Sequence, residues 1–252
     1  MKLFLILFLF STQAFAMRVV STSPAISEMV SRLGGEKLLI GVTPYCLDGA
    51  TASKIGTALQ LDFEKVISLK PDIVILQENS PGKASRVLKK LGLKILIVKI
   101  ITLDDLFLAW EKIAATLKLD SDKILKLKKK ITPNKNIKRV LFKLGGAPEQ
   151  SAMVAGKDTF YADLAKSLGS TYAISAGGWP SLSAEELISL LATDTIIIEI
   201  TTHQDRLWSQ TQWNKFCPTC RVLTWVDARA AYPGPAMVES IVKLYQEHGE
   251  SR

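Results

Sequence analysis

The sequence predicts an α/β protein of two related lobes with mostly parallel central sheets, joined by one long backbone helix, with a ligand cleft between the lobes. Short continuous apolar runs, typical of buried parallel strands, alternate with helix signals. One helix–strand segment occurs twice, and a long helical pattern separates the two copies. We therefore expect an N-terminal lobe over 17–102, a backbone helix over 103–132 and a C-terminal lobe over 133–252.

The first sixteen residues differ from the rest of the chain. Lys2 precedes an apolar run over 3–10, and the segment ends in Ala14-Phe15-Ala16. This is the pattern of a secretory signal peptide cut after Ala16. The alternative, a membrane anchor, needs about 20 apolar residues and the run is shorter. No cysteine follows the cut, so we expect no lipid attachment there. We expect the mature protein to be a monomer that is exported into a periplasm.

The elements of the first lobe follow from local signals. Ser23 and Pro24 are typical N-cap and first helical residues, so a helix follows over 25–33. A strand over 18–20 precedes this helix, and a strand over 38–42 follows it. The next loop carries Tyr45.

A second pattern indicates that the lobes are related. The segment 61–76 reads as a cap, a glutamate, Ile-Ser-Leu, an aspartate and a β-branched strand, and 182–198 repeats that order with one extra residue. Short amphipathic patterns also recur by chance, which is the alternative. Matching strands support the repeat, at 18–20 and 139–141 and again at 93–100 and 221–226.

The segment between the lobes predicts one uninterrupted helix. Asp104 or Thr102 can cap its start, and Thr132-Pro133-Asn134 ends it. A helix of that length spans roughly 40 Å. Its apolar positions, in near-helical spacing, are Leu106, Trp110, Ile113, Leu117, Ile124, Leu127 and Ile131.

Charge and missing motifs exclude several functions. The net charge is +8, but much of the excess lies in 117–138, which fits a solvated helix face better than a nucleic-acid-binding surface. His203 and His248 are the only histidines, and no cluster has metal-ligand spacing. Neither a G-x-S-x-G elbow nor a P-loop is present. We expect no enzyme, no catalytic residues, no bound metal and no intrinsic cofactor.

The three cysteines have two interpretations. In an oxidising compartment Cys217 and Cys220 can form a small structural disulfide. The alternative is a periplasmic redox protein, but a redox CxxC opens a helix, whereas this pair precedes the strand-like segment 221–226. We favour the structural disulfide, which leaves Cys46 unpaired.

Binding remains as the function. Four aromatic residues lie in loops or at strand ends, where sites are usually built. Trp225 lies within a strand, so we expect it in the core. Tyr45, Trp179 and Tyr232 lie among proline and glycine residues, and we expect them in a binding site.

Five stretches together resemble the class III periplasmic substrate-binding proteins of ABC importers, and among them the cobalamin-binding members most. The resemblance covers nearly all of the chain after the signal peptide. It implies two α/β lobes, one backbone helix and a ligand held in the cleft. The stretches are RVVSTSPAISEMVSRLGG (18–35), LIGVTPYC (39–46), FEKVISLKPDIVIL (63–76), AGKDTFYADLAKSLG (155–169) and GGWPSLSAEEL (177–187).

The resemblance implies a corrinoid ligand and a set of residues that bind it. Where cobalamin binders have further tryptophans, this chain has Ala58 or Leu59 and Gln77, and its last loop departs from their pattern. Haem and ferric siderophores are the alternative ligands of this metal-chelate uptake class. The position of the iron-ligand tyrosine of the haem binders corresponds to the neighbourhood of Ala58 and Leu59 in this chain, which counts against haem. The implied ligand-binding residues are Pro24, Ala25, Ile26, Tyr45, Gln77, Trp179, Asp227, Arg229 and Tyr232.

The two glutamates after Ser183 receive separate roles. Ser183 and Glu186 have the spacing of a capping box. Glu185 then faces outward, as Glu64 does after the Asp62 cap. In the family, one such glutamate on each lobe docks onto arginines of the membrane permease. Acidic residues also favour helix starts on their own account, which is the alternative explanation.

Overall fold

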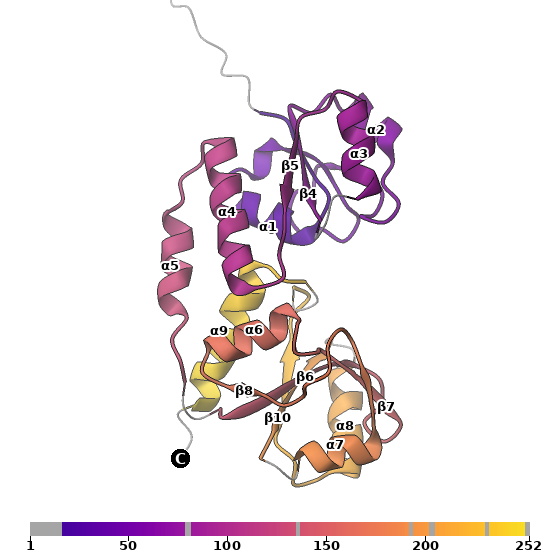
Figure 1. Ribbon diagram of the computed structural model, residues 1–252, viewed down its shortest axis with the longest axis vertical. Coiled ribbons are helices and arrows are strands. Elements are labelled where there is room, and N and C mark those ends of the chain that lie inside the picture. Colours follow the sequence, from indigo (N-terminus) through magenta and orange to yellow (C-terminus); the bar gives the residue numbers. More distant parts are fainter. Residues whose placement is uncertain are drawn as a thin grey trace, which may run out of the picture.

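The computed structural model describes residues 17–78, 82–134, 137–191, 194–201, 205–229 and 232–249. The expected signal peptide and His203 therefore lie outside the described residues. Two α/β lobes follow one another along the long axis of the molecule (Figure 1). This confirms the predicted fold class. Within the residues described, none of the helices combines the length and apolar character of a membrane span.

The first lobe is a five-stranded, fully parallel sheet in the order β3-β2-β1-β4-β5. The side chain of Ser23 accepts a hydrogen bond from the amide of Ile26, which confirms the predicted cap. The strands are β1 (Val19–Ser21), β2 (Leu39–Val42), β3 (Ser53–Lys54), β4 (Ile73–Gln77) and β5 (Ile95–Val98). The helices are α1 (Pro24–Arg32), η1 (Glu36–Leu38), α2 (Phe63–Ser68) and α3 (Lys83–Lys90).

The second lobe is a mostly parallel sheet in the order β11-β10-β6-β7-β9, with β8 also paired to β6. Only the pairs β6–β7 and β7–β9 are antiparallel. The strands are β6 (Arg139–Gly145), β7 (Ser151–Val154), β8 (Thr171–Tyr172), β9 (Ser181–Ser183), β10 (Ile196–Thr201) and β11 (Val222–Val226). The helices are α6 (Phe160–Ser167), α7 (Ala184–Leu191), α8 (Arg206–Phe216) and α9 (Pro235–Gly249).

The repeat seen in the sequence recurs in the sheets. Strand β1 pairs with β4, and β4 with β5, just as β6 pairs with β10 and β10 with β11. Strand β2 lies parallel to β1, and β8 lies parallel to β6. The two lobes therefore share one arrangement of strands, to which the second lobe adds the β7 and β9 edge.

The prediction of one uninterrupted backbone helix was wrong. The segment forms α4 (Leu103–Leu117) and α5 (Asp122–Lys130), and α5 runs back along α4 (Figure 1). Lys118 adopts a left-handed conformation (φ 55°), and the amide of Leu119 donates to the carbonyl of Ala114 at 2.9 Å. This pattern ends a helix and reverses the chain. The backbone helix is therefore α4 alone, about 22 Å long at 1.5 Å per residue.

Helix α4 joins the two lobes through buried contacts. It packs on α1 of the first lobe and on α6 of the second. The buried indole of Trp110 donates its Nε1–H to the carbonyl of Met29 at 3.1 Å, which fixes α4 against α1. Helix α9 also packs on α1, so both lobes share one hydrophobic core at their junction.

The core of the second lobe holds a charged pair that the sequence analysis missed. Lys143 of β6 donates to Oε1 of Glu199 on β10 at 2.5 Å, and their side chains are 1% and 6% exposed. The other carboxylate oxygen accepts from the hydroxyl of Ser209 and, at 2.6 Å, from the indole of Trp213. Buried charges are tolerated where they are paired and fully hydrogen-bonded, as here.

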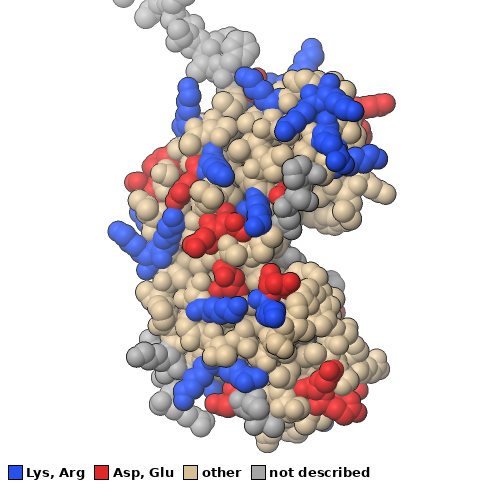
Figure 2. Space-filling view, in the orientation of Figure 1, with Lys and Arg blue, Asp and Glu red and all other residues tan. Residues whose placement is uncertain are grey.

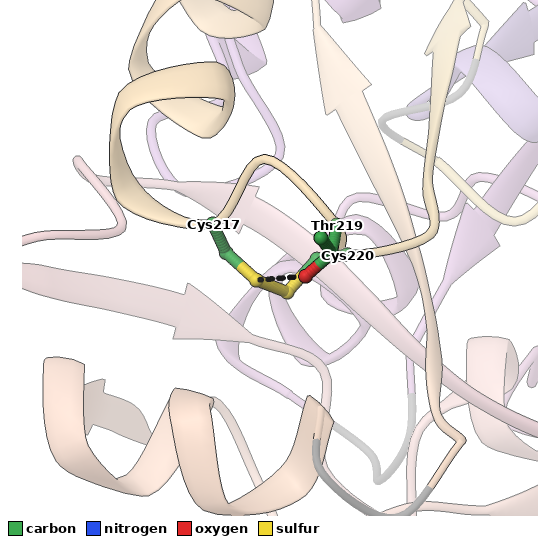
Figure 3. Close-up of a disulfide and its surroundings, with 3 residues drawn as sticks. All are labelled: Cys217, Thr219 and Cys220. Atoms are coloured by element: carbon green, nitrogen blue, oxygen red, sulfur yellow. Dashed lines mark hydrogen bonds between the residues drawn. A yellow bond between two sulfur atoms is a disulfide. The ribbon is translucent and has the colours of Figure 1, made fainter.

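Cys217 and Cys220 form a disulfide directly after α8, with Cα atoms 5.4 Å apart (Figure 3). The pair stands at a helix C-terminus, where the helix dipole disfavours a thiolate, and a redox CxxC needs the opposite end. Cys46 is a buried free thiol that contacts the hydroxyls of Ser27 and Thr43 at 3.2 and 3.1 Å.

We expect the Cys217→Ser/Cys220→Ser double variant to lose only about 2 kcal/mol of unfolding free energy, because the closed loop is short and constrains little chain entropy. Urea unfolding with and without a reductant measures this loss. The same variant should keep its ligand affinity, since α8 starts at the carboxyl edge of the sheet and Cys217 follows its far end. Mass spectrometry that finds Cys217 and Cys220 reduced and reactive, in a protein that is stable without them, would revive the redox interpretation.

Candidate functional site

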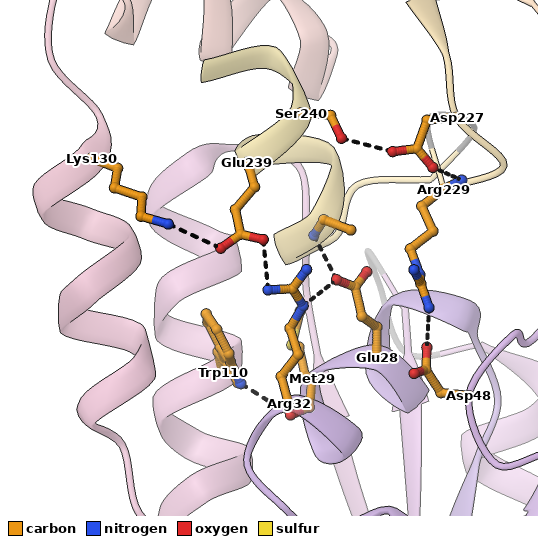
Figure 4. Close-up of polar contacts among 11 residues, drawn as sticks. Glu28, Met29, Arg32, Asp48, Trp110, Lys130, Asp227, Arg229, Glu239 and Ser240 are labelled. Atoms are coloured by element: carbon orange, nitrogen blue, oxygen red, sulfur yellow. Dashed lines mark hydrogen bonds and ion pairs between the residues drawn. The ribbon is translucent and has the colours of Figure 1, made fainter. Parts of the chain in front are cut away.

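The loops that follow β2 in the first lobe and β11 in the second meet between the lobes. Asp48 follows β2 of the first lobe and Arg229 follows β11 of the second, and their side chains form an ion pair at 3.6 Å (Figure 4). Figure 2 shows the molecule hollowed between the lobes. Loops at the carboxyl ends of parallel strands commonly form ligand sites.

Trp179 lines a cavity of about 290 Å³ at the junction of the lobes. Its indole is 55% exposed, and its ring stands edge-on to that of Tyr161, with centroids 6.0 Å apart. The exposed indole suits contact with an apolar part of a ligand. The other lining residues, from both sides of the junction, are Ile100, Ile101, Asp158, Thr159, Phe160, Gly178 and Pro233.

The backbone around Trp179 is held in place by its neighbours. Gly178 has φ 67° and donates its amide to Oδ1 of Asp158 at 2.7 Å. A Cβ on Gly156 would lie 2.6 Å from the carbonyl carbon of Gly177, so only glycine fits there. The glycine residues around Trp179 therefore set the approach of two loops and present the indole in a fixed position.

The first-lobe residues of the expected site differ in exposure. Tyr45 is 71% exposed, and Gln77, at the end of β4, is half-buried. Ala25 and Ile26 are 1% and 0% exposed, so their side chains belong to the core and cannot line the cleft in this structure. Pro24 at the start of α1 keeps some exposed surface.

The loop that follows β11 makes contacts within the protein. Asp227 accepts from the amide of Arg229 at 2.8 Å and from the hydroxyl of Ser240 at 2.7 Å (Figure 4). The Tyr232 hydroxyl is buried, and this burial raises the pKa of Tyr232. In this conformation Tyr232 offers no exposed oxygen to an iron atom. Ligand roles for these three residues stay predictions.

Glu28 joins the lobes at the same junction. Its Oε1 atom accepts from the amide of Ala236 in α9 and from Nε of Arg32, the latter at 2.6 Å (Figure 4). Arg32 also pairs with Glu239 of α9 at 2.9 Å. Burial outweighs the neighbouring charge of Arg32 and raises the pKa of Glu28 to about 7.

This raised pKa predicts a pH dependence. A carboxyl whose pKa rises on folding binds its proton more tightly when folded, so its contribution is full below about pH 4.5 and is lost as the pH rises through about 7. The free energy of unfolding of Glu28→Gln, measured by urea titration between pH 5 and 8, should lack this decline. Parallel pH curves for the two proteins would contradict the assignment.

The sequence analysis missed two exposed apolar residues at the second-lobe edge. Leu207 and Trp208 lie in the first turn of α8 and are 75% and 51% exposed. Because α8 connects the parallel strands β10 and β11, its first turn lies at the carboxyl edge that faces the cleft. The signal was a pair of large apolar residues, Leu207 and Trp208, within an otherwise polar segment after β10.

The two glutamates expected to dock are exposed on helices that correspond in the repeat. Glu64 follows the Asp62 cap, whose Oδ1 accepts from the amide of Lys65 at 2.9 Å. Ser183 and Glu186 form the predicted capping box, with bonds of 2.8 and 3.3 Å. Glu185 is left at the surface, where hydrogen bonds from its own amide and from Ser183 lower its pKa and keep it charged.

No group of three or more His, Cys, Asp or Glu residues in the described part of the chain is placed to hold a metal ion. Most residues that line the junction cavity are aromatic or apolar. Their arrangement is suited to grip a ligand between two surfaces.

Comparison with known proteins shows which proteins this chain resembles. Residues 19–100, about a third of the chain, match the periplasmic binding protein family. An uncharacterised ABC transporter substrate-binding lipoprotein of Bacillus subtilis, YvrC, is 24% identical over 90% of this chain and 78% of its own length. These matches make this chain similar to the substrate-binding components of ABC transporters.

Solved structures show the same fold. The periplasmic haem-binding protein HutB of Vibrio cholerae has a TM-score of 0.74 at 18% identity, covering 91% of this chain and 98% of that one. The vitamin B12-binding protein BtuF of Vibrio cholerae has a TM-score of 0.63 at 16% identity, covering 94% and 99%. Because proteins of this fold bind different ligands, the fold alone does not select one.

Proposed function

We propose that this protein captures cobalamin or a related corrinoid in the periplasm, after removal of a signal peptide at Ala16, and delivers it to a membrane permease. The observation that carries the ligand proposal is the aromatic wall of Trp179 and Tyr161 in the junction cavity. A flat macrocycle with apolar faces can lie against an exposed aromatic ring such as the indole of Trp179.

The ligand experiment is calorimetric titration of the purified protein with cyanocobalamin, haemin and a ferric hydroxamate. Corrinoid binding with a Kd below about 10 μM, roughly −7 kcal/mol, supports the proposal. Haem and a ferric siderophore are the alternative ligands, because a haem-binding protein and a siderophore-binding protein of Vibrio cholerae also share this fold. Tight binding of haemin without corrinoid binding would transfer the proposal to haem.

The permease contact has a separate prediction. We expect Glu64→Lys/Glu185→Lys to leave corrinoid affinity unchanged and to reduce uptake at least tenfold, because both carboxylates are exposed and outside the junction cavity. Uptake of labelled corrinoid by cells that carry the variant measures this. The control is Glu111→Lys, which reverses an exposed charge on α4. Normal uptake by the double variant would remove the docking assignment.

A further inference from the structure

The outer face of α3 in the first lobe carries a dense positive charge. Figure 2 shows basic side chains gathered over the part of the molecule that Figure 1 labels α2 and α3. Helix α3 contains no acidic residue, and its cationic side chains are exposed. We define the α3 basic face as Lys83, Arg86, Lys89 and Lys90 of α3 together with Lys94, which lies in the connection from α3 to β5.

The helix itself orients these charges. Lys83, Arg86 and Lys90 follow an i, i+3, i+7 spacing, which places them along one side of the helix. Ser85 and Leu88 on the other side are buried. The packing of α3 therefore forces its cationic side chains away from the lobe.

The α3 basic face forms no ion pairs within the described part of the protein. The carboxylate of Glu78, just before α3, accepts from the amides of Gly82 and Ser85 at 2.9 and 3.2 Å and caps the helix. By contrast, α5 is partly compensated, because Lys128 pairs with Glu111 at 2.6 Å.

We propose that the α3 basic face binds the anionic phospholipid headgroups of the membrane around the permease. The inference rests on the proposed function, since delivery to a permease brings the first lobe to that membrane. Val66 of α2 and Leu88 of α3 are buried in the same core cluster, so both helices cover the same face of the sheet. Glu64, on α2, is the residue expected to dock.

The chemistry of the face favours lipid headgroups over a protein pocket. Four of its five residues are lysines, which are hydrated point charges suited to a diffuse anionic surface, whereas specific protein contacts favour arginine and aromatic anchors. Four to eight basic residues are the usual number for attraction to anionic lipid. This attraction acts over about one Debye length and needs no shaped partner.

The test is flotation of the purified protein with permease-free vesicles of phosphatidylglycerol and phosphatidylethanolamine, compared with phosphatidylcholine vesicles. We expect at least tenfold stronger binding to the anionic vesicles, lost at about 1 M salt, where the Debye length is about 3 Å. The variant Lys83→Gln/Arg86→Gln/Lys89→Gln/Lys90→Gln should bind them at least fivefold more weakly than the unchanged protein.

The matched control is Lys112→Gln/Lys123→Gln/Lys126→Gln/Lys129→Gln, which removes four exposed charges from α4 and α5. Equal losses in both variants would mean that only net charge matters, and would overturn the proposal. Absence of any anionic preference, or binding only to vesicles that contain the permease, would overturn it as well. Corrinoid titration of each protein separates these outcomes from failure of the proposed function, because the vesicle assay contains no ligand.

Discussion

Trp179→Ala should weaken corrinoid binding by about 1 to 3 kcal/mol, by analogy with stacking of flat ring systems on aromatic side chains. By the usual conversion this is roughly a 5- to 150-fold rise in Kd. The reason is geometric, since the indole is 55% exposed, lines the junction cavity and is held in place by Gly156 and Gly178. Calorimetric titration of wild type and variant with cyanocobalamin measures the loss.

Two further variants make this result specific. Trp179→Phe keeps an aromatic face and should recover most of the affinity. Leu108→Ala removes an apolar side chain of similar exposure, 50%, from α4 outside the cavity and should leave the Kd unchanged. A folded Trp179→Ala protein that binds as tightly as the wild type would make the indole a structural residue and its contact with Tyr161 its whole role.

The largest loss of stability is expected from Glu199→Ala, at about 3 to 5 kcal/mol. The substitution leaves Lys143 charged inside the core with no counter-ion, because its side chain is 1% exposed. It also removes the acceptor for Ser209 and for the indole of Trp213. Urea unfolding followed by far-UV circular dichroism gives the free energies of both proteins.

The chain offers a matched control for this prediction. Glu111 pairs with Lys128 at 2.6 Å, close to the Lys143–Glu199 distance, but it is 46% exposed. Exposed pairs contribute little, so Glu111→Ala should cost less than about 1 kcal/mol. Lys143→Met/Glu199→Met should recover much of the stability lost in Glu199→Ala, since no charge is then left unpaired. If the two alanine variants cost the same, burial of the pair is not what makes it important.

The fold was predictable where local chemistry decides it. Ser23 and the Ser183–Glu186 box act within a few residues, and the apolar runs of β1, β4 and β10 allow only buried strands. The backbone helix was mispredicted because its apolar spacing continues across the break. The usable signal was Asp120-Ser121-Asp122, where Asp120 accepts from the amide of Asp122 at 2.9 Å, as turn-forming residues do.

The site was less predictable because its contacts join distant segments. Trp179 was expected in the cleft, and the structure places it against the junction cavity. Arg229 was expected to meet ligand, yet its partner Asp48 belongs to the other lobe, and no local pattern reveals such a pair. Ile26 matched a binding loop by position, but its side chain is buried in the hydrophobic core. Sequence position indicated the loops correctly and the direction of their side chains poorly.

The junction of α1 with α9 has an energetic consequence for delivery. Moving the lobes apart there would separate Glu28 from the amide of Ala236, Arg32 from Glu239 and Arg229 from Asp48. Breaking one partner from a buried carboxylate is costly. We therefore expect thermal motion alone to open the lobes rarely, so that unloading depends on work supplied from outside the protein. In that case the energy that separates the lobes and releases the ligand comes from the transporter.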